Sequence, residues 1–237
     1  MRKDNKIEWS TVAMAKPYFE TDPCGVVLDE LYIEAKRDKL KVLPRLPWFL
    51  VRRIFGREFS QIFKTSDFSN VYMPVDREEG KFLYRVARAR RPKLIVEFGS
   101  SYGISAVFLG SALKDQGFGQ MIGTEIEHAK VVASQTNIRK AGLEAQVSIR
   151  EGDALQTLRD LNSPIDILFL DGWKDLYLPL VKMLLPKLDS GAVLLSDNMQ
   201  TFRRELVSFR EFLLSLEGGF SSLTVPLGDG IEFAVKI

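Results

Sequence analysis

The strongest candidates for chemistry are oxygen-bearing side chains at the ends of two apolar runs. The run 165–171 (IDILFLD) ends on Asp171, and the run 191–197 (GAVLLSD) ends on Asp197 with Asn198 directly after it. Because the carboxyl ends of parallel strands meet at one edge of a sheet, we expect these side chains to converge there. Two carboxylates and an amide are hard oxygen ligands of the kind that Mg²⁺ accepts. The spacing predicts a site for Mg²⁺ or another divalent cation, whereas one Cys and one His exclude a structural zinc site.

Lys174 follows Asp171 by three residues, in the first turn of an expected helix, so its flexible side chain can reach over the same edge. A bound dication favours an oxyanion, and a lysine whose pKa is lowered by a neighbouring cation can take the proton. Asp171 and Lys174 are therefore the candidate catalytic residues. The alternatives are that Lys174 is a solvated surface lysine, and that Asp197 and Asn198 are an N-cap and a turn residue.

A glycine-containing turn follows the first clear strand. The segment VEFGSSYGIS (96–105) ends an apolar run and opens a helix, which is where parallel α/β sheets bind ligands. Gly99 and Gly103 let the backbone approach a ligand, and the helix start offers free N–H groups to a carboxylate or phosphate, with Ser101 between them. The Gly-x-x-x-Gly spacing differs from the Gly-x-Gly-x-x-Gly of dinucleotide folds. Taken alone, the pair is as well explained by a tight turn.

Two glutamates indicate what this turn would bind. Glu97 would place negative charge beside a pyrophosphate, which disfavours a nicotinamide-dependent dehydrogenase and favours a ligand with cationic groups. Glu125 ends the next apolar run, where a carboxylate can accept hydrogen bonds from two ribose hydroxyls. Together they suit S-adenosylmethionine, which carries an ammonium, a carboxylate, a sulfonium and a ribose. Asp153 in EGDAL (151–155), with Ala154 beside it, is a further candidate near the adenine, and a helix N-cap explains Asp153 equally well.

Composition is that of an ordinary globular protein. The chain has 237 residues, of which 46% are hydrophobic and 27% charged, and this length suits one domain with at most an appendage. The formal net charge of +2 predicts no nucleic-acid partner. Cys24 is the single cysteine, and no membrane-spanning run or signal sequence is recognisable. We therefore expect a cytoplasmic protein without stable membrane insertion that acts on a small molecule.

Apolar runs and helical patterns alternate from residue 93 onward, which indicates βαβ units and a mostly parallel sheet covered on both faces. Strands are expected over 93–99, 120–126, 145–151, 165–171 and 191–197, and helices over 103–116, 127–142 and 173–188. The runs 220–227 and 231–237, joined by Gly-Asp-Gly, predict a terminal hairpin. Before it, one helical stripe is expected, ended by the glycines at 218–219 and formed by Phe202, Leu206, Phe209, Leu213 and Leu216.

Residues 1–71 contain helical patterns and no convincing strand, which predicts a helical N-terminal cap or lid on a domain that spans 72–237. One amphipathic face is expected from Val27, Leu28, Leu31, Tyr32 and Ala35. The segment LPWFLVRRIFG (46–56) fits a packed lid or a subunit contact better than a membrane-surface helix, so a homodimer is possible. The nearby cluster of Arg52, Arg53 and Arg57 fits a solvated face better than an anion site, and His128 is expected on a helix face.

From about residue 72 to the C-terminus, the chain resembles the cation-dependent O-methyltransferases of the catechol and caffeoyl-CoA group. The resemblance is densest in DGWKDLYLPL (171–180) and LLSDN (194–198). It implies a Rossmann-like α/β fold with a seven-stranded, mostly parallel sheet and an antiparallel C-terminal hairpin. It also implies that Mg²⁺ is bound by Asp171, Asp197 and Asn198, that Lys174 is the base, and that Glu125 binds the ribose.

The same resemblance implies further cofactor contacts. Met73 and Val75 in YMPVDREEG (72–80) would border the methyl donor, and Ser105 would bind its carboxylate. Ile126 and Trp173 would pack near the adenosine or methionine parts.

Three departures limit what can be said of the acceptor. Gly172 stands where catechol enzymes carry His, and no acid is visible near Leu223, where those enzymes contact the second catechol hydroxyl. Residues 1–71, which would help to build the acceptor pocket, match nothing assignable. The resulting hypothesis is an S-adenosylmethionine- and divalent-cation-dependent O-methyltransferase of a small hydroxylated, catechol-like acceptor. The alternatives are an O-methyltransferase of a sugar or polyketide-type product, and a non-catalytic protein that binds the same cofactor.

Overall fold

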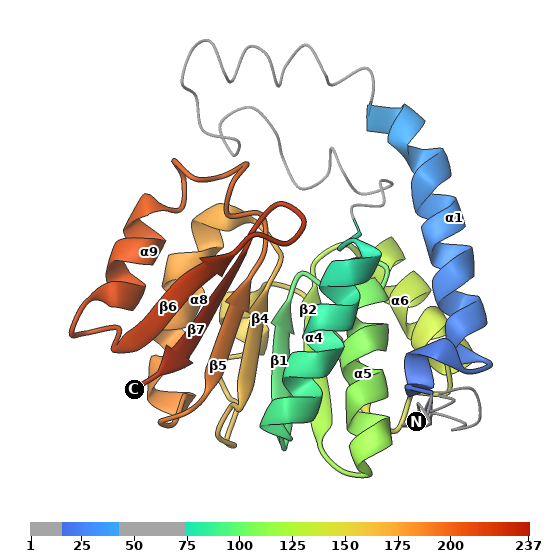
Figure 1. Cartoon of the computed structure of the whole chain (residues 1–237), viewed down its shortest axis with the longest axis horizontal. Coiled ribbons are helices and arrows are strands. Elements are labelled where there is room, and N and C mark those ends of the chain that lie inside the picture. Colours follow the sequence, from blue (N-terminus) through green and yellow to red (C-terminus); the bar gives the residue numbers. More distant parts are fainter. Residues whose placement is uncertain (1–15, 43–73) are drawn as a thin grey trace, which may run out of the picture.

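Seven strands form one sheet within residues 16–42 and 74–237, the residues that the computed structural model describes. They are β1 (Leu94–Phe98), β2 (Gln120–Glu125), β3 (Val147–Glu151), β4 (Ile167–Leu170), β5 (Val193–Ser196), β6 (Phe220–Val225) and β7 (Ile231–Lys236). Their order is β3-β2-β1-β4-β5-β7-β6, with β1 to β5 paired in parallel and β7 antiparallel to both of its neighbours (Figure 1). The predicted mostly parallel sheet with a terminal antiparallel hairpin is confirmed.

Helices cover both faces of this sheet (Figure 1). One face is covered by α4 (Arg77–Arg90), α5 (Ile104–Gln116) and α6 (His128–Lys140), and the other by α7 (Ala154–Thr157), α8 (Tyr177–Leu184) and α9 (Val207–Leu214). Side chains alternate along β1, so that Ile95 joins the first core cluster whereas Val96 and Phe98 join the second. Because both faces are buried, the central strands are continuous apolar runs rather than alternating ones.

The helix predicted over 173–188 is instead three pieces. A 3₁₀ turn, η5 (Lys174–Leu176), precedes α8, and a second, η6 (Leu185–Lys187), follows it. Pro186 accounts for the end of α8, because proline has no backbone N–H to continue the hydrogen-bond ladder. The helical region after Asp171 therefore begins tightly wound, which keeps Lys174 close to the end of β4.

The helical stripe predicted from Phe202 to Leu216 is shorter than expected. Only α9 is helical in this region, Phe202 lies in the turns before it, and Leu216 is fully exposed beyond its end. The backbone becomes extended at Ser215 and then folds back so tightly that a Cβ on Gly218 would lie 2.0 Å from the carbonyl oxygen of Phe212. Gly218 therefore permits this fold-back. Contrary to the prediction, it does not end the helix, because α9 has already ended at Leu214.

The described part of the N-terminal segment packs on the same core as the sheet. The turn η2 (Tyr18–Glu20) is followed by α1 (Cys24–Val42), which lies against α5 and α6. Its predicted amphipathic face is confirmed, with Tyr32 partly buried and the others buried: Val27, Leu28, Leu31 and Ala35. The segment 46–56, Met73 and the three arginines Arg52, Arg53 and Arg57 lie outside the described residues, so the boundary at 71/72 stays a prediction.

None of the helices in the described ranges is long and apolar enough to cross a lipid bilayer. The expectations of a cytoplasmic location and of a homodimer are not tested by this finding and stay predictions.

The start of α4 is fixed by a capping box. Asp76 accepts a hydrogen bond from the backbone N–H of Glu79 (2.8 Å), and the Glu79 carboxylate accepts one from the backbone N–H of Asp76 (2.6 Å). Glu79 is 4% exposed, and its other oxygen accepts a hydrogen bond from the N–H of Asp229 (3.3 Å) in the turn between β6 and β7. The first turn of α4 is thereby joined to the turn of the terminal hairpin.

We expect Asp76→Ala to lower the free energy of unfolding by about 1 kcal/mol, since it removes a side-chain cap from the helix start. Urea unfolding would measure the loss. Glu78→Ala in the same helical turn is the matched control, because Glu78 pairs only with Lys81 at the surface and should matter little. Equal losses in the two variants would contradict the capping argument.

Candidate active site

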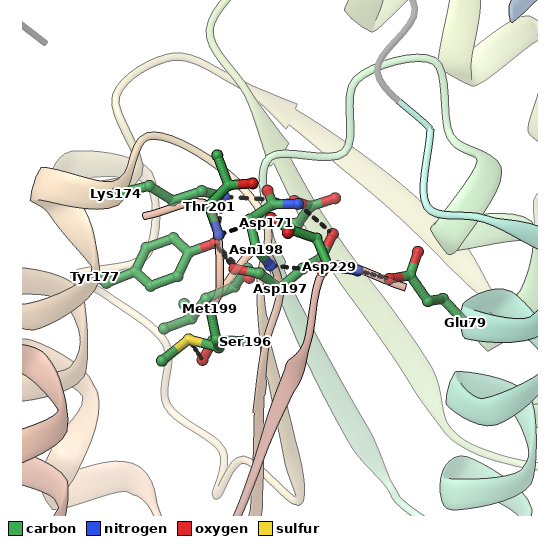
Figure 2. Close-up of polar contacts among 11 residues, drawn as sticks. Glu79, Asp171, Lys174, Tyr177, Ser196, Asp197, Asn198, Met199, Thr201 and Asp229 are labelled. Atoms are coloured by element: carbon green, nitrogen blue, oxygen red, sulfur yellow. Dashed lines mark hydrogen bonds and ion pairs between the residues drawn. The ribbon is translucent and has the colours of Figure 1, made fainter. Parts of the chain in front are cut away.

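The side chains predicted to converge do meet at the C-terminal edge of the sheet. Leu170 and Ser196 are paired in the parallel register of β4 and β5, so the next residues, Asp171 and Asp197, lie side by side (Figure 2). The backbone N–H of Asp197 donates to the carbonyl of Leu170 at 3.0 Å. The expected convergence is confirmed, whereas the roles of these residues as metal ligands stay predictions.

Asn198 takes a strained conformation next to Asp197. Its φ is 65°, in the left-handed region of the backbone that residues other than glycine rarely adopt. In this conformation its backbone N–H donates to Asp197 Oδ1 at 2.6 Å and its Nδ2 donates to Oδ2 at 3.0 Å. The N-cap alternative for Asp197 is wrong, since the following helix, α9, begins only at Val207.

Lys174 supplies the positive charge closest to these carboxylates. Its Nζ lies 3.6 Å from Asp171 Oδ1, and the Lys174 and Asp171 side chains are only 10% and 14% exposed. Burial lowers the pKa of Lys174, and the carboxylates of Asp171 and Asp197 partly oppose that shift. Lys174 is therefore not a solvated surface lysine, and a buried amine with a lowered pKa can accept a proton.

Burial and neighbouring carboxylates raise the cost of ionising both Asp171 and Asp197. Burial is the main cause of the raised pKa of Asp171, followed by repulsion from Asp197, while Lys174 acts in the opposite direction. Burial also raises the pKa of Asp197, again opposed by Lys174. Among the described residues, these two carboxyl groups of low exposure thus share the one lysine beside them, so their negative charge exceeds its positive charge.

These residues fit a divalent cation by their chemistry. No group of three His, Cys, Asp or Glu side chains in the described ranges forms a ready metal site, so a cation would need the amide of Asn198 beside the two carboxylates. Hard oxygen donors with uncompensated negative charge are suited to Mg²⁺.

Sequence reasoning missed Tyr177, which lies under Lys174. The Lys174 Nζ donates to the Tyr177 hydroxyl at 2.7 Å, and that hydroxyl donates to the carbonyl of Leu170 at 2.8 Å (Figure 2). Tyr177 is fully buried, and burial raises the pKa of its phenol well above the usual value. Its place three residues after Lys174 was the available signal, because such residues share one face of a helical turn.

Glu79 and Asp229 were also missed. Figure 2 shows both on the side of Asp197 that faces α4. Burial, followed by repulsion from Asp197, raises the pKa of Glu79 to about 7. Asp229 Oδ2 accepts a hydrogen bond from the backbone N–H of Thr201 at 3.2 Å. The spacing Asp76-x-x-Glu79 is a capping-box pattern and could have located Glu79.

The glycine turn brings the end of β1 against the end of β4. Gly99 has a φ of 93°, and a Cβ there would lie 2.7 Å from backbone atoms of Gly172, so no side chain fits. A Cβ on Gly172 would in turn lie 2.4 Å from the ring of Phe98. Phe98 therefore fills the space that a side chain at 172 would need, which explains the glycine where catechol enzymes carry His. Gly103, with a φ of 88°, stands at the N-terminus of α5.

Glu125 is held in place by backbone groups at the end of β2. Its Oε2 accepts a hydrogen bond from the N–H of Ser101 (2.8 Å), and its Oε1 accepts those of Ile126 (2.8 Å) and Glu127 (2.9 Å). Carboxylate oxygens accept about two hydrogen bonds each, and Oε2 accepts a single one from the part of the chain that the structure describes, so it can accept another from a ligand hydroxyl. The glycine turn is thus hydrogen-bonded directly to Glu125, the residue predicted to bind the ribose.

Glu97 is a fully buried carboxyl group behind the glycine turn. Its Oε2 accepts a hydrogen bond from the Ser100 hydroxyl at 2.5 Å, whereas Oε1 has no hydrogen-bond partner among the described residues. Burial raises the pKa of Glu97, and the hydrogen bond from Ser100 partly offsets the shift. A buried carboxylate oxygen without a partner fits a ligand that carries a cationic group.

A pocket opens beside this turn, and five of the predicted site residues line it: Val75, Gly99, Ser101, Ser105 and Asp171. Other predicted cofactor residues lie away from its walls. Asp153 caps α7 by accepting a hydrogen bond from the N–H of Leu155 (2.9 Å), as the N-cap alternative predicts, and Ala154 is buried. Ile126 is 53% exposed and Trp173 is half-buried. His128 is exposed on α6 and contacts Glu151, away from the site.

Comparison with known proteins gives a consistent result. A family model described as a methyltransferase domain matches residues 96–199. A catechol O-methyltransferase of Niastella koreensis is 31% identical over 142 residues, which are 57% of this chain and 63% of that protein. That of Sus scrofa is 30% identical over 134 residues, 54% of this chain and 71% of that protein. The chain spans less than two thirds of the length of the Niastella relative.

The fold also has solved relatives. An O-methyltransferase from Bacillus cereus, solved in complex with SAH, superposes with a TM-score of 0.69 at 20% identity and covers 93% of this chain and 96% of that one. At this identity the likeness shows the fold alone.

Glu79→Gln should change the pH dependence of stability. A carboxyl group whose pKa rises from 4.5 to about 7 on folding costs stability as pH rises between those values. The variant should therefore gain on the order of 1 to 2 kcal/mol relative to wild type between pH 5 and pH 8, as measured by urea unfolding. Glu78→Gln is the control, because the pKa of Glu78 is lowered and it stays ionised throughout this range. A pH-independent difference for Glu79→Gln would contradict the assignment.

Proposed function

Because the chain belongs to the S-adenosylmethionine-dependent O-methyltransferases of the catechol and caffeoyl-CoA type, we propose that it transfers a methyl group from S-adenosylmethionine to a hydroxyl group of a small acceptor with the help of a divalent cation. The observation that carries the proposal is the placement of Lys174 and two buried carboxylates beside the pocket lined by the glycine turn. Cofactor site, cation site and base thus meet at one edge of the sheet.

The residues around the glycine turn support the choice of cofactor. Glu125, oriented by three backbone N–H groups, would bind the ribose hydroxyls. Glu97, with one unpartnered oxygen, would attract the ammonium group through Oε1. Gly99 and Gly103 would let the backbone approach the methionine part. The contacts proposed for five further residues follow from the family resemblance: Met73, Val75, Ser105, Ile126 and Trp173. Those proposed for Asp153 and Ala154 follow from their place just after β3.

Asp171, Asp197 and the amide of Asn198 would hold Mg²⁺ or another divalent cation. When bound, such a cation favours the ionised form of an acceptor hydroxyl at neutral pH. The negative charge of these side chains supports this proposal, because a cation would offset the burial cost and the repulsion from neighbouring carboxylates that raise the pKa values of Asp171 and Asp197.

Lys174 would act as the general base. Burial lowers its pKa, so its neutral amine is more accessible than that of a surface lysine. In the overall reaction the acceptor oxygen forms a bond to the methyl carbon as the carbon–sulfur bond breaks, and the acceptor proton passes to Lys174 Nζ. The low exposure of Lys174 and Asp171 keeps bulk water away from this proton.

A catechol-like acceptor is favoured, because adjacent hydroxyls can reach a cation and Lys174 together. Leu223, at the position where catechol enzymes carry an acid, is 59% exposed on β6, so the second hydroxyl would need another partner. A sugar or a polyketide-type product remains the alternative acceptor, and an acceptor screen with mass detection distinguishes the two. A protein that bound the cofactor without any turnover in that screen would fit the non-catalytic alternative instead.

Asp171→Ala should abolish cation-dependent methylation, with turnover at least about 100-fold lower, while the fold stays intact. Methyl transfer followed by mass spectrometry, with and without a chelator, measures the effect, and circular dichroism checks the fold. Asp175→Ala, at an exposed position four residues further on, should behave as wild type. Wild-type turnover that is indifferent to chelator would refute the cation part of the proposal, and absence of S-adenosylmethionine binding in calorimetry would refute the whole.

Lys174→Met should lower kcat by about 10² to 10⁴, the usual contribution of a general base, and should change the calorimetric Kd for S-adenosylmethionine less than about twofold. Lys182→Met, the same substitution at an exposed lysine of α8, serves as control. If Lys174→Met weakened cofactor binding as much as turnover, Lys174 would be a binding residue rather than the base.

A further inference from the structure

Tyr177 is a buried polar residue directly beneath the proposed base. It begins α8, and its ring makes edge contacts with Phe98 (centroids 6.4 Å apart) and Phe209 (5.5 Å). These aromatic contacts, together with full burial, leave the phenol ring little freedom to move. The position of the Tyr177 hydroxyl is therefore set by the hydrophobic core and not by the residues of the site.

The hydrogen bonds of this hydroxyl are directional. Its single proton lies toward the carbonyl oxygens of Leu170 (2.8 Å) and Asp197 (3.3 Å), which leaves the oxygen lone pairs to accept from Lys174 Nζ at 2.7 Å. Leu170 directly precedes Asp171 in the chain. One hydroxyl thus contacts the proposed base and the ends of both strands that carry the proposed cation ligands (Figure 2).

The Leu170 carbonyl alone does not account for a hydroxyl at this position. The carbonyl of Leu170 already accepts a hydrogen bond from the backbone N–H of Asp197 at 3.0 Å, so it would stay satisfied beside a phenylalanine. The shorter contact of the hydroxyl is the one to Lys174, at 2.7 Å. A residue needed only to fill the core would not require the hydroxyl.

The geometry constrains the direction in which Lys174 can accept a proton. A neutral amine has two N–H bonds and one lone pair. One N–H is directed to the Tyr177 hydroxyl at 2.7 Å. Asp171 Oδ1, 3.6 Å from Nζ, is beyond hydrogen-bond distance but attracts the amine to the same side. The rings of Tyr177 and Phe202 lie 4.8 and 5.5 Å from the same nitrogen and limit where it can move. With one N–H bond fixed and the nitrogen confined in this way, the directions open to the lone pair are restricted.

We propose that Tyr177 is a positioning residue whose hydroxyl holds Lys174 Nζ with its lone pair directed at the acceptor oxygen. The proposal rests on the proposed function, since it assumes that Lys174 is the base. It goes beyond that function by assigning the alignment of base and cation ligands to one buried hydroxyl, which contacts the ends of β4 and β5 and Lys174 at once.

Tyr177→Phe tests this directly, because it removes the hydroxyl and keeps the ring. With catechol as acceptor, kcat should fall about tenfold or more, while KM and the calorimetric Kd for S-adenosylmethionine change less than about twofold. With 4-nitrocatechol, whose more acidic hydroxyl is already ionised in mildly alkaline buffer, the loss should shrink to less than about threefold because little proton transfer is required. A purely structural role would lower turnover of both acceptors alike.

Tyr84→Phe is the matched control. The Tyr84 hydroxyl donates to Asp115 at 2.6 Å on the face of α4 and α5 remote from the site, so its loss should leave both acceptors unaffected. Equal losses on the two catechols in Tyr177→Phe, or no loss on either, would overturn the positioning role.

Crystal structures of the cation-free wild type and of Tyr177→Phe provide a readout independent of activity. Nζ should lie within hydrogen-bond distance of the hydroxyl in the wild type and should move or become disordered in the variant. A wild-type crystal with Nζ away from Tyr177, or a variant with Nζ unmoved, would overturn the proposal. If the wild type methylated neither catechol, the catechol-like acceptor would be refuted, and the two crystal structures would still decide whether Tyr177 positions Lys174.

Discussion

The site depends on two buried carboxylates placed side by side at the ends of parallel strands. The register of β4 and β5 places Asp171 and Asp197 together, and burial with mutual repulsion raises the pKa of Asp171. The surrounding structure holds them there. Asn198 takes a left-handed backbone conformation, in which its backbone N–H and its side-chain amide both donate to Asp197. Lys174 lies beside Asp171 and is only 10% exposed. Such an arrangement costs folding stability, and a ligand of opposite charge is what would offset the cost.

The half of the site around the glycine turn follows a different constraint, which is close backbone approach. The ends of β1 and β4 come so near that neither Gly99 nor Gly172 has room for a side chain, and the ring of Phe98 occupies the space beside Gly172. This approach puts the turn that would bind the cofactor directly against the strand end that carries Asp171. The distance between the proposed methyl donor and the proposed base would therefore be set by strand neighbours in the sheet rather than by a flexible loop.

Elements outside the sheet stabilise this edge from two sides. On one side the capping box of α4 directs Glu79 to the turn of the terminal hairpin, which connects the helix start with Asp229. On the other side the aromatic contacts of Tyr177 fix a hydroxyl beneath Lys174. Residues that touch neither cofactor nor cation thus determine how accurately the charged groups are placed, as expected for a site assembled on rigid elements.

Much of this arrangement could be predicted from the sequence alone, because it depends on local patterns. Alternating apolar runs and helical segments gave the mostly parallel sheet and its hairpin, and parallel strands bring Asp171, Asp197 and Asn198 to one edge whatever the details of packing. Tertiary structure decided the rest. The end of α9 before Leu216, the N-cap role of Asp153, the burial of Lys174 and the contacts of Tyr177 and Glu79 depend on what packs against each residue, which is information that no sequence window contains. The order of residues along the chain thus decided which charged side chains reach the sheet edge. Burial in the folded structure decided their pKa values and their orientation.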